Sequence, residues 1–108
     1  MTGAPAPALV WCPFGSDAEA RAAAATLLDE GLIACANILP GVHSLYVWNG
    51  AREEAVETAV LFKSNADMLE KLIARLDALH PYAQPSILGW RCDGASPATA
   101  AWLGSLGG

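Results

Sequence analysis

The chain has 108 residues, enough for one domain and too few for two. Its net charge is -5 and its six basic residues are scattered singly, so we expect no nucleic-acid partner. No apolar run is long enough to span a bilayer, so we expect no membrane association either. Cys12, Cys35 and Cys92 are an odd number at wide spacing, which argues against a disulfide framework and favours the reducing cytoplasm.

The first segments predict a tail, a strand and a helix. Residues 1–7 are rich in alanine, proline and glycine, and we expect them to form a flexible tail. The apolar run at 9–12 predicts a short buried strand. Ser16 and Glu19 form a capping-box pattern, in which each side chain binds the backbone amide of the other at the start of an alanine-rich helix. Gly31 suits the left-handed position that ends such a helix.

Residues 32–64 show no helical period and predict a β-hairpin. Asn49 and Gly50 are a strong signal for a two-residue turn between its arms. Pro40 and Gly41 interrupt the first arm, so a bend or bulge is expected there. The cross-strand pairs that this turn predicts are Trp48 with Ala51, Tyr46 with Glu53, and His43 with Val56.

The second half of the chain predicts a helix, a strand and a closing helix. Leucines fall on one face of the first helix, and Pro81 ends it. The expected ranges are 65–79 for the helix, 86–90 for the strand, and a last helix that begins with Ser96 and Pro97. The order βαββαβ followed by a helix predicts an α+β, ferredoxin-like sandwich of four antiparallel strands and two helices, as one domain over residues 8–108.

The hairpin is too long for the domain that carries it. Each arm of ~14 residues would extend ~45 Å, whereas the core helices cover only ~23 Å. The tip, residues 45–48, therefore projects beyond its own domain with an apolar strand end, which is an aggregation hazard unless another chain pairs with it. Charged residues are only 16% of the chain, which also favours a buried subunit interface.

Four blocks of residues together resemble the CutA family, in order and spacing, over nearly the whole chain. The blocks are Ala34-Cys35-Ala36-Asn37, Tyr46-Val47-Trp48-Asn49-Gly50, Lys63, and His80-Pro81-Tyr82 with Pro85. The resemblance implies a ferredoxin-like fold assembled as a tight homotrimer through long hairpin strands, like the PII signalling proteins. It also implies a part in tolerance to copper and other divalent cations, a cytoplasmic location in bacteria, and no enzyme activity.

The metal site that the resemblance implies uses a cysteine at the end of the first strand and two adjacent histidines before Pro-Tyr. Cys12 and His80 match the cysteine and the second histidine, but Leu79 replaces the first histidine and Ser86 replaces a frequent glutamate. In a split βαβ sandwich the first strand and the second helix point the same way, so the two ligands can share one pole. We expect weak binding of copper or another divalent cation, and no required cofactor. The alternative roles are packing for Cys12 and helix capping for His80.

A cleft between subunits is the second candidate site. Tyr46, Trp48 and Tyr82 are expected either to line such a cleft or to pack in the interface, with the interface favoured for Trp48. The resemblance adds Glu57 and Lys63 to the cleft, and their alternative role is as solvated or interface-paired charges.

Three other classes of function stay open. An enzyme is disfavoured because no nucleophile–base set, zinc-protease motif or phosphate loop is visible. A PII-like sensor of a small ligand would be favoured by a glycine-rich phosphate cradle, which the sequence lacks. A structural or interaction trimer is the third class.

Overall fold

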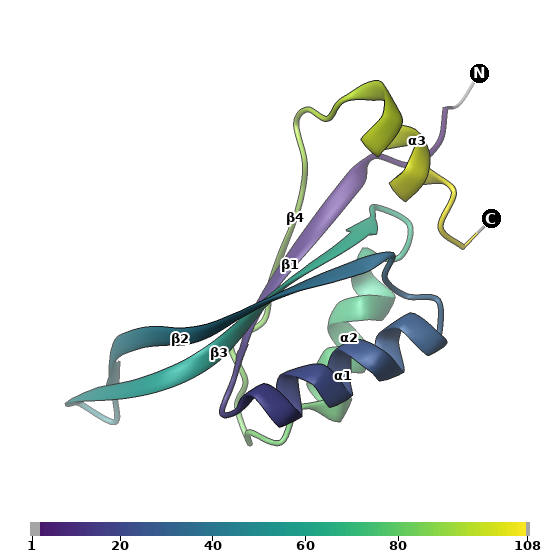
Figure 1. Cartoon of the computed structure of the whole chain (residues 1–108). Helices are drawn as coiled ribbons and strands as arrows, with labels where there is room; N and C mark the ends of the chain where they lie inside the picture. The colour runs from purple at the N-terminus through teal and green to yellow at the C-terminus, as the bar shows by residue number, and fades with distance from the viewer. Residues whose placement is uncertain (1–2, 108) are drawn as a thin grey trace.

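The computed structural model describes residues 3–107 and shows one four-stranded sheet with helices packed against it (Figure 1). The strand order is β2-β3-β1-β4, and all neighbouring strands are antiparallel. This is the expected ferredoxin-like α+β fold. The elements are β1 (Pro7–Phe14), α1 (Asp17–Asp29), β2 (Cys35–Trp48), β3 (Ala51–Asn65), α2 (Leu69–Leu79), β4 (Leu88–Arg91) and α3 (Pro97–Gly104).

The start of the chain is only partly described. Met1 and Thr2, from the expected tail, lie outside the described residues. β1 begins at Pro7, so the strand takes in the last residue of that segment. The backbone oxygen of Ala6 also accepts a hydrogen bond of 2.8 Å from Ala66.

The core lies between the sheet and the α1–α2 layer. Residues of β1 alternate between half-buried and fully buried, because successive side chains of a strand point to opposite faces. The buried face of β1 meets alanines and Leu27 of α1, and Leu72 and Leu76 of α2. Large side chains from β1 and β3 fill most of this space, with Phe14 and Phe62 in edge-to-face contact. The alanine-rich helix can therefore lie close to the sheet.

The start and end of α1 follow the expected signals with one difference. The Ser16 hydroxyl oxygen accepts a hydrogen bond from the Glu19 backbone N–H at 3.2 Å, as predicted. The second half of the capping box was wrong: the Glu19 carboxylate accepts from the Ser16 hydroxyl at 3.1 Å, and no bond to the Ser16 amide is formed. Gly31 has a φ of 72°, which confirms the left-handed end of the helix.

The β2–β3 hairpin has the predicted turn and register. Asn49 and Gly50 both have positive φ, and the pairs of Trp48 with Ala51, Tyr46 with Glu53, and His43 with Val56 are all present. The register shifts between Leu39 and Val42, where Gly41 has a φ of 74°, so the predicted bulge is confirmed.

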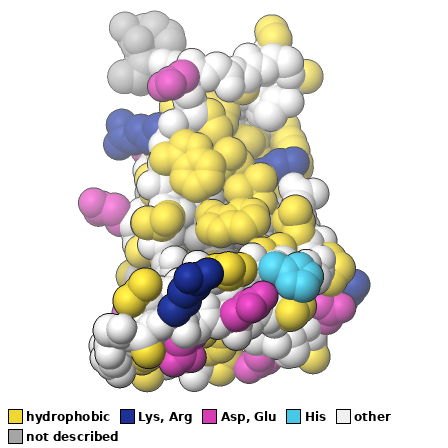
Figure 2. Space-filling model, turned by 90° about the vertical axis from the view of Figure 1, so that its left-hand side faces the viewer, with side chains coloured by type: hydrophobic (Ala, Val, Ile, Leu, Met, Phe, Trp, Pro, Cys, Tyr) yellow, Lys and Arg dark blue, Asp and Glu magenta, His cyan; other side chains and the backbone are white. Residues whose placement is uncertain are grey.

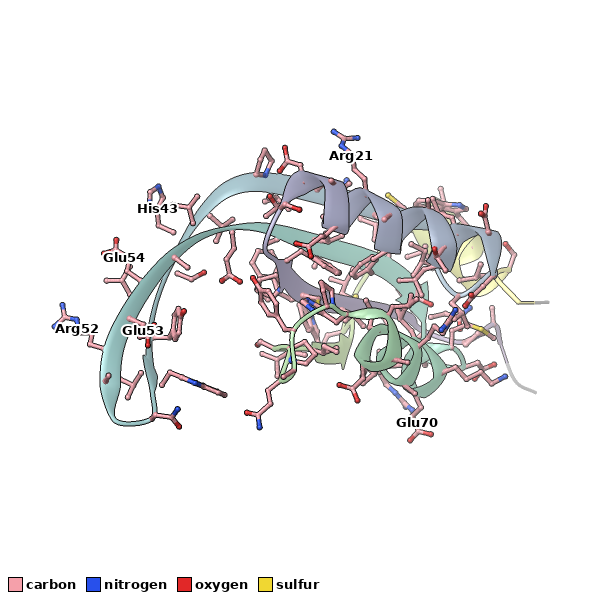
Figure 3. The ribbon with its side chains drawn as sticks, turned by 90° about the horizontal axis from the view of Figure 1, so that it is seen from below. Arg21, His43, Arg52, Glu53, Glu54 and Glu70 are labelled. Atoms are coloured by element: carbon pink, nitrogen blue, oxygen red, sulfur yellow. The ribbon has the colours of Figure 1, made fainter. Side chains whose placement is uncertain are left out.

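The end of the hairpin extends past the rest of the domain. β1 ends at Phe14, opposite Thr58, so the part of β3 before that point pairs with β2 alone. The molecule is 51 Å long but only 26 × 22 Å across. Figure 3 shows the hairpin curving away from the body, with Arg52, Glu53 and Glu54 on the projecting part. The predicted projection of the tip is therefore confirmed.

Asn65 joins three parts of the chain at the opposite end of the molecule. Its side-chain oxygen accepts hydrogen bonds from the backbone N–H groups of Asp67 and Met68, which form a turn, so α2 begins at Leu69 rather than at residue 65. Its side-chain NH₂ donates to the carbonyl oxygens of Leu103, at 2.8 Å, and Leu106, at 3.0 Å, at the end of α3. All the hydrogen-bonding groups of this buried amide are thus used.

Candidate functional site

The ends of β1 and α2 meet at one pole of the domain, as the topology predicted. His80 follows the last residue of α2 and is 7% exposed. Its Nε2 lies 2.7 Å from the backbone oxygen of Pro13, and its ring stacks on Phe14 with centroids 4.4 Å apart. The His80 side chain therefore connects the end of α2 to the end of β1. The expected capping role, in which it would donate to the last carbonyls of its own helix, is not seen.

The two hydrogen-bond partners of His80 define its tautomer. The Pro13 carbonyl can only accept, so Nε2 carries the proton and donates it. The backbone N–H of Tyr82 donates to Nδ1 at 3.1 Å, so Nδ1 is the acceptor. Both ring nitrogens are thus occupied in the neutral ring, and a metal ion needs one of these bonds to break before it gains a ligand.

Cys12 lies on the helix-facing side of β1 and is fully buried. Its Sγ lies 3.8 Å from the Pro13 carbonyl that also binds His80. Burial raises the pKa of the Cys12 thiol to about 12, and the negative charge of Glu57 adds to the increase. Since the thiolate is the metal ligand, a thiol that keeps its proton at neutral pH is a poor one.

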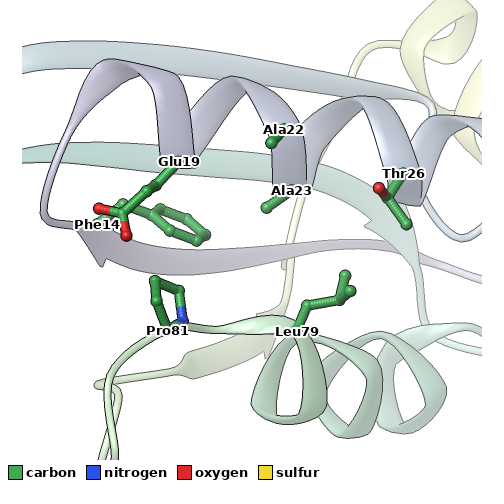
Figure 4. Close-up of a pocket in the computed structure, with 7 residues that line it drawn as sticks. All are labelled: Phe14, Glu19, Ala22, Ala23, Thr26, Leu79 and Pro81. Carbon is green, nitrogen blue, oxygen red and sulfur yellow. The ribbon is translucent and has the colours of Figure 1, made fainter.

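The remaining groups at this pole do not complete a metal site. Within residues 3–107 the structure gathers no group of three or more His, Cys, Asp or Glu side chains that could hold a metal ion. Leu79, at the position of the family's first histidine, points away into a cavity of about 240 Å³ between α1 and α2, next to Phe14 and Ala23 (Figure 4). In this arrangement Cys12 and His80 do not fit a tightly held ion.

The second candidate site is partly assembled in one chain. The Tyr82 hydroxyl donates to the Glu57 carboxylate at 2.9 Å, and the Tyr82 ring lies 4.6 Å from the ring of His80. Burial raises the pKa of Tyr82 to about 12, and so do the hydrogen bond and charge of Glu57, with smaller contributions from Glu19 and Tyr46. Glu57 and Tyr82 are therefore neighbours at the base of the projecting hairpin, whereas Tyr46 pairs with Glu53 nearer its tip.

The other two residues proposed for this cleft lie elsewhere. Lys63 pairs with Leu9 and Cys35, well along β3 from Glu57, so one chain does not bring the two charges together. Trp48 is at the hairpin tip and is 47% exposed. Sequence reasoning missed Pro13 and Phe14, which both contact His80. The alternation of the first strand points to Phe14, but no residue-type signal marks a backbone carbonyl such as that of Pro13.

The sheet face opposite α1 and α2 is apolar and largely uncovered. The strand register places Leu9 beside Trp90 and Trp11 beside both Leu61 and Leu88 on this face. Trp90 is 45% exposed and Leu88 is 62% exposed. Figure 2, viewed from the side of the hairpin, shows hydrophobic side chains gathered over the middle of the molecule. We call this surface the open sheet face.

Within residues 3–107, no helix has the length and apolar character required to cross a membrane.

Comparison with known proteins gives a consistent result over nearly the whole chain. Residues 8–105 match the family profile described as CutA1 divalent ion tolerance protein. The divalent-cation tolerance protein CutA of Yersinia pestis (strain Pestoides F) is 41% identical over 80 residues, which cover 74% of this chain and 67% of that protein.

Two solved structures show how closely the fold agrees. The divalent cation tolerance protein of Thermus thermophilus is 35% identical with a TM-score of 0.85, covering 90% of this chain and 94% of that one. The protein from Archaeoglobus fulgidus, named a periplasmic divalent cation tolerance protein CutA, is 27% identical with a TM-score of 0.85, covering 90% and 94%. The fold and the family match agree, and the chain belongs to the CutA1 divalent ion tolerance family.

Proposed function

We propose that this chain acts in cellular tolerance to copper and other divalent cations, and that it acts by binding rather than by catalysis. The observation that carries the proposal is the family match over residues 8–105. The raised pKa values of the Cys12 thiol and the Tyr82 phenol support a role without catalysis. Cys12 and Tyr82 both have a pKa raised to about 12, the opposite of the lowered pKa that activates a nucleophile.

A homotrimer is the working form that we propose. The open sheet face supports it, because a monomer rarely leaves so many large apolar side chains of one face uncovered. The projecting hairpin supports it as well, since the strand end with Leu45 and Val47 at 61% and 72% exposure gains partners only from another chain. Tyr46 and Trp48 on the projecting hairpin, and Tyr82 at its base, would then lie at or beside the subunit boundary.

We propose that any metal bound at the pole by Cys12 and His80 is bound weakly, and that no cofactor is required. The buried thiol and the two occupied nitrogens of His80 support this. The alternative of a PII-like sensor for an anion such as a nucleotide is disfavoured, because Glu57 and Glu19 surround the Tyr82 hydroxyl with negative charge.

The cytoplasm is the compartment that we propose. Three free cysteines, of which Cys35 and Cys92 are partly exposed, suit a reducing environment. The relative from Archaeoglobus fulgidus is named periplasmic, so a direct test is needed. Fractionation of cells that make the chain with an epitope tag would give it in the cytoplasmic fraction, and recovery by osmotic shock would contradict the proposal.

The test of function is complementation. A bacterial strain with its own CutA gene deleted is grown in rising concentrations of copper, and separately of zinc, with and without this chain. We expect the chain to restore growth at concentrations that inhibit the deletion strain. If growth equals that of the empty vector while the protein is present in soluble form, the proposed function is wrong.

A further inference from the structure

α2 has a second groove, on the side away from α1. It has a volume of about 380 Å³ and is lined by Glu70, Ile73, Ala74, Asp77, Pro85 and Ile87. Ile73 and Ala74 form the floor on α2, whereas Leu72 and Leu76 of the same helix face the core. Pro85 and Ile87 form the other wall, on the segment that returns from the end of α2 to β4. Four of the six lining residues, Ile73, Ala74, Pro85 and Ile87, are thus apolar.

Two carboxylates stand at the rim of this groove. Glu70 and Asp77 are seven residues apart on α2, so they lie on the same side of the helix at a separation of ~10 Å along its axis. Figure 3 shows the Glu70 side chain projecting from α2 into solvent. Among the described residues, neither carboxylate has a Lys or Arg within ion-pair distance, and the nearby cation Arg75 is already paired with Glu30 at 2.7 Å.

We propose that this groove binds a linear aliphatic diammonium ion. Its methylene chain would lie on Ile73, Pro85 and Ile87, and its two ammonium groups would meet Glu70 and Asp77. Complementary charge at both rims selects a dication, and the apolar floor selects a chain that spans the distance between them. A divalent metal ion fits less well, because carboxylates two helical turns apart cannot both bind one ion. This inference stands independently of the proposed role in cation tolerance.

A trimer assembled through the open sheet face would leave the groove accessible. It lies on the α2 side of the sheet, whereas the open sheet face is on the other side. The test is therefore made on the assembled protein at low ionic strength, by calorimetric titration with 1,7-diaminoheptane. Three comparison ligands are used. Hexylamine lacks the second charge, 1,2-diaminoethane lacks the long chain, and Mg²⁺ carries two charges but has no methylene chain.

We expect 1,7-diaminoheptane to bind at least about threefold more tightly than hexylamine, since one exposed ion pair is worth roughly that factor. We expect a larger margin over 1,2-diaminoethane, because each buried methylene adds up to about fourfold. Glu70→Gln and Asp77→Asn should each weaken the long diamine about threefold. Asp29→Asn, at the exposed end of α1, is the matched control and should leave the affinity unchanged.

Three results would overturn the proposal. Equal binding of the long diamine, 1,2-diaminoethane and Mg²⁺ would mean that the ions respond only to the net charge of -5. Unchanged affinity in the double variant of Glu70 and Asp77 would place the ligand elsewhere. If no ligand binds, or if the double variant changes the mass of the assembly, the groove is closed or is covered by a neighbouring copy of the chain.

Discussion

At the residue scale, the Cys12 thiol and the Nε2–H of His80 both donate to the carbonyl oxygen of Pro13. A metal ion at this pole has to displace the thiol proton of Cys12 and one hydrogen bond of His80. Each of these steps takes free energy from binding, and two ligands leave the coordination sphere of a soft or borderline ion incomplete. Geometry and protonation together therefore favour a weak site.

The first prediction concerns this pole. Titration with Cu(I) and Zn(II) should show weak binding that strengthens as the pH rises, because the metal competes with the thiol proton, whose pKa is about 12. Cys12→Ala and His80→Ala should each weaken it, while Cys35→Ala is the control. Mg(II), which prefers several oxygen ligands, should not bind there. Unchanged affinity in both pole variants would mean that any metal binds elsewhere.

The second prediction concerns Tyr82. Its pKa is raised from 10.0 to about 12 in the folded chain, so its contribution to stability is complete below pH 10 and is lost as the pH rises from 10 through 12. Tyr82→Phe should therefore flatten the fall of the unfolding free energy in that window. The pKa of Cys12 rises from 9.0 to about 12, so its contribution is lost over an overlapping range in both proteins, and the difference between them isolates Tyr82.

Urea unfolding at several alkaline pH values measures this effect, and absorbance of tyrosinate follows the ionisation directly. The chain has two tyrosines, so the variant leaves Tyr46 as the sole source of that signal. Equal slopes of stability against pH in parent and variant would show that the hydrogen bond to Glu57 does not protect the Tyr82 phenol.

At the element scale, the β2–β3 hairpin carries its tip past the end of β1, and Trp48 stands on it. The third prediction is that Trp48→Ala weakens assembly by about 2 kcal/mol, because a buried interface tryptophan contributes at least that much, and leaves the monomer fold intact. Arg21→Ala is the control, since Arg21 is an exposed residue of α1, away from both the hairpin and the open sheet face. Light scattering over a dilution series measures assembly, and circular dichroism measures fold. If the Trp48 variant stays assembled to the same dilution as the parent, Trp48 is not an interface anchor.

The hairpin also shows what the sequence could and could not predict. The two-residue turn at Asn49 and Gly50 determined the cross-strand pairs as far as Val42 with Glu57, because loop length sets register, and the bulge at Gly41 shifts the register beyond that point. The start of α2 was expected too early, because the Asn65 side chain takes the amides that would have begun the helix. The contact of His80 with Pro13 could not be predicted, since it joins a side chain to a backbone oxygen far away in the sequence.

At the scale of the whole molecule, the open sheet face and the projecting hairpin both lack a partner within one chain. The fourth prediction is that light scattering of the purified protein gives a mass of about three times 11.2 kDa at micromolar concentration. The physical reason is that a ring of copies covers the open sheet faces and pairs the hairpin ends, which an isolated chain cannot do. A clean monomer would contradict the assembly and the role given to the hairpin.

Asn65 and its neighbour Ala66 have one further consequence. Ala66 binds Ala6 near the beginning of the chain, and Asn65 binds Leu106 near its end, so both ends of the described polypeptide are held beside the same dipeptide. A short flexible linker can therefore connect them, and the chain can be opened instead at the turn between Asn49 and Gly50. In such a circular permutant the new termini lie at the far tip of the hairpin, where a fluorescent probe would report directly on whether neighbouring copies are present.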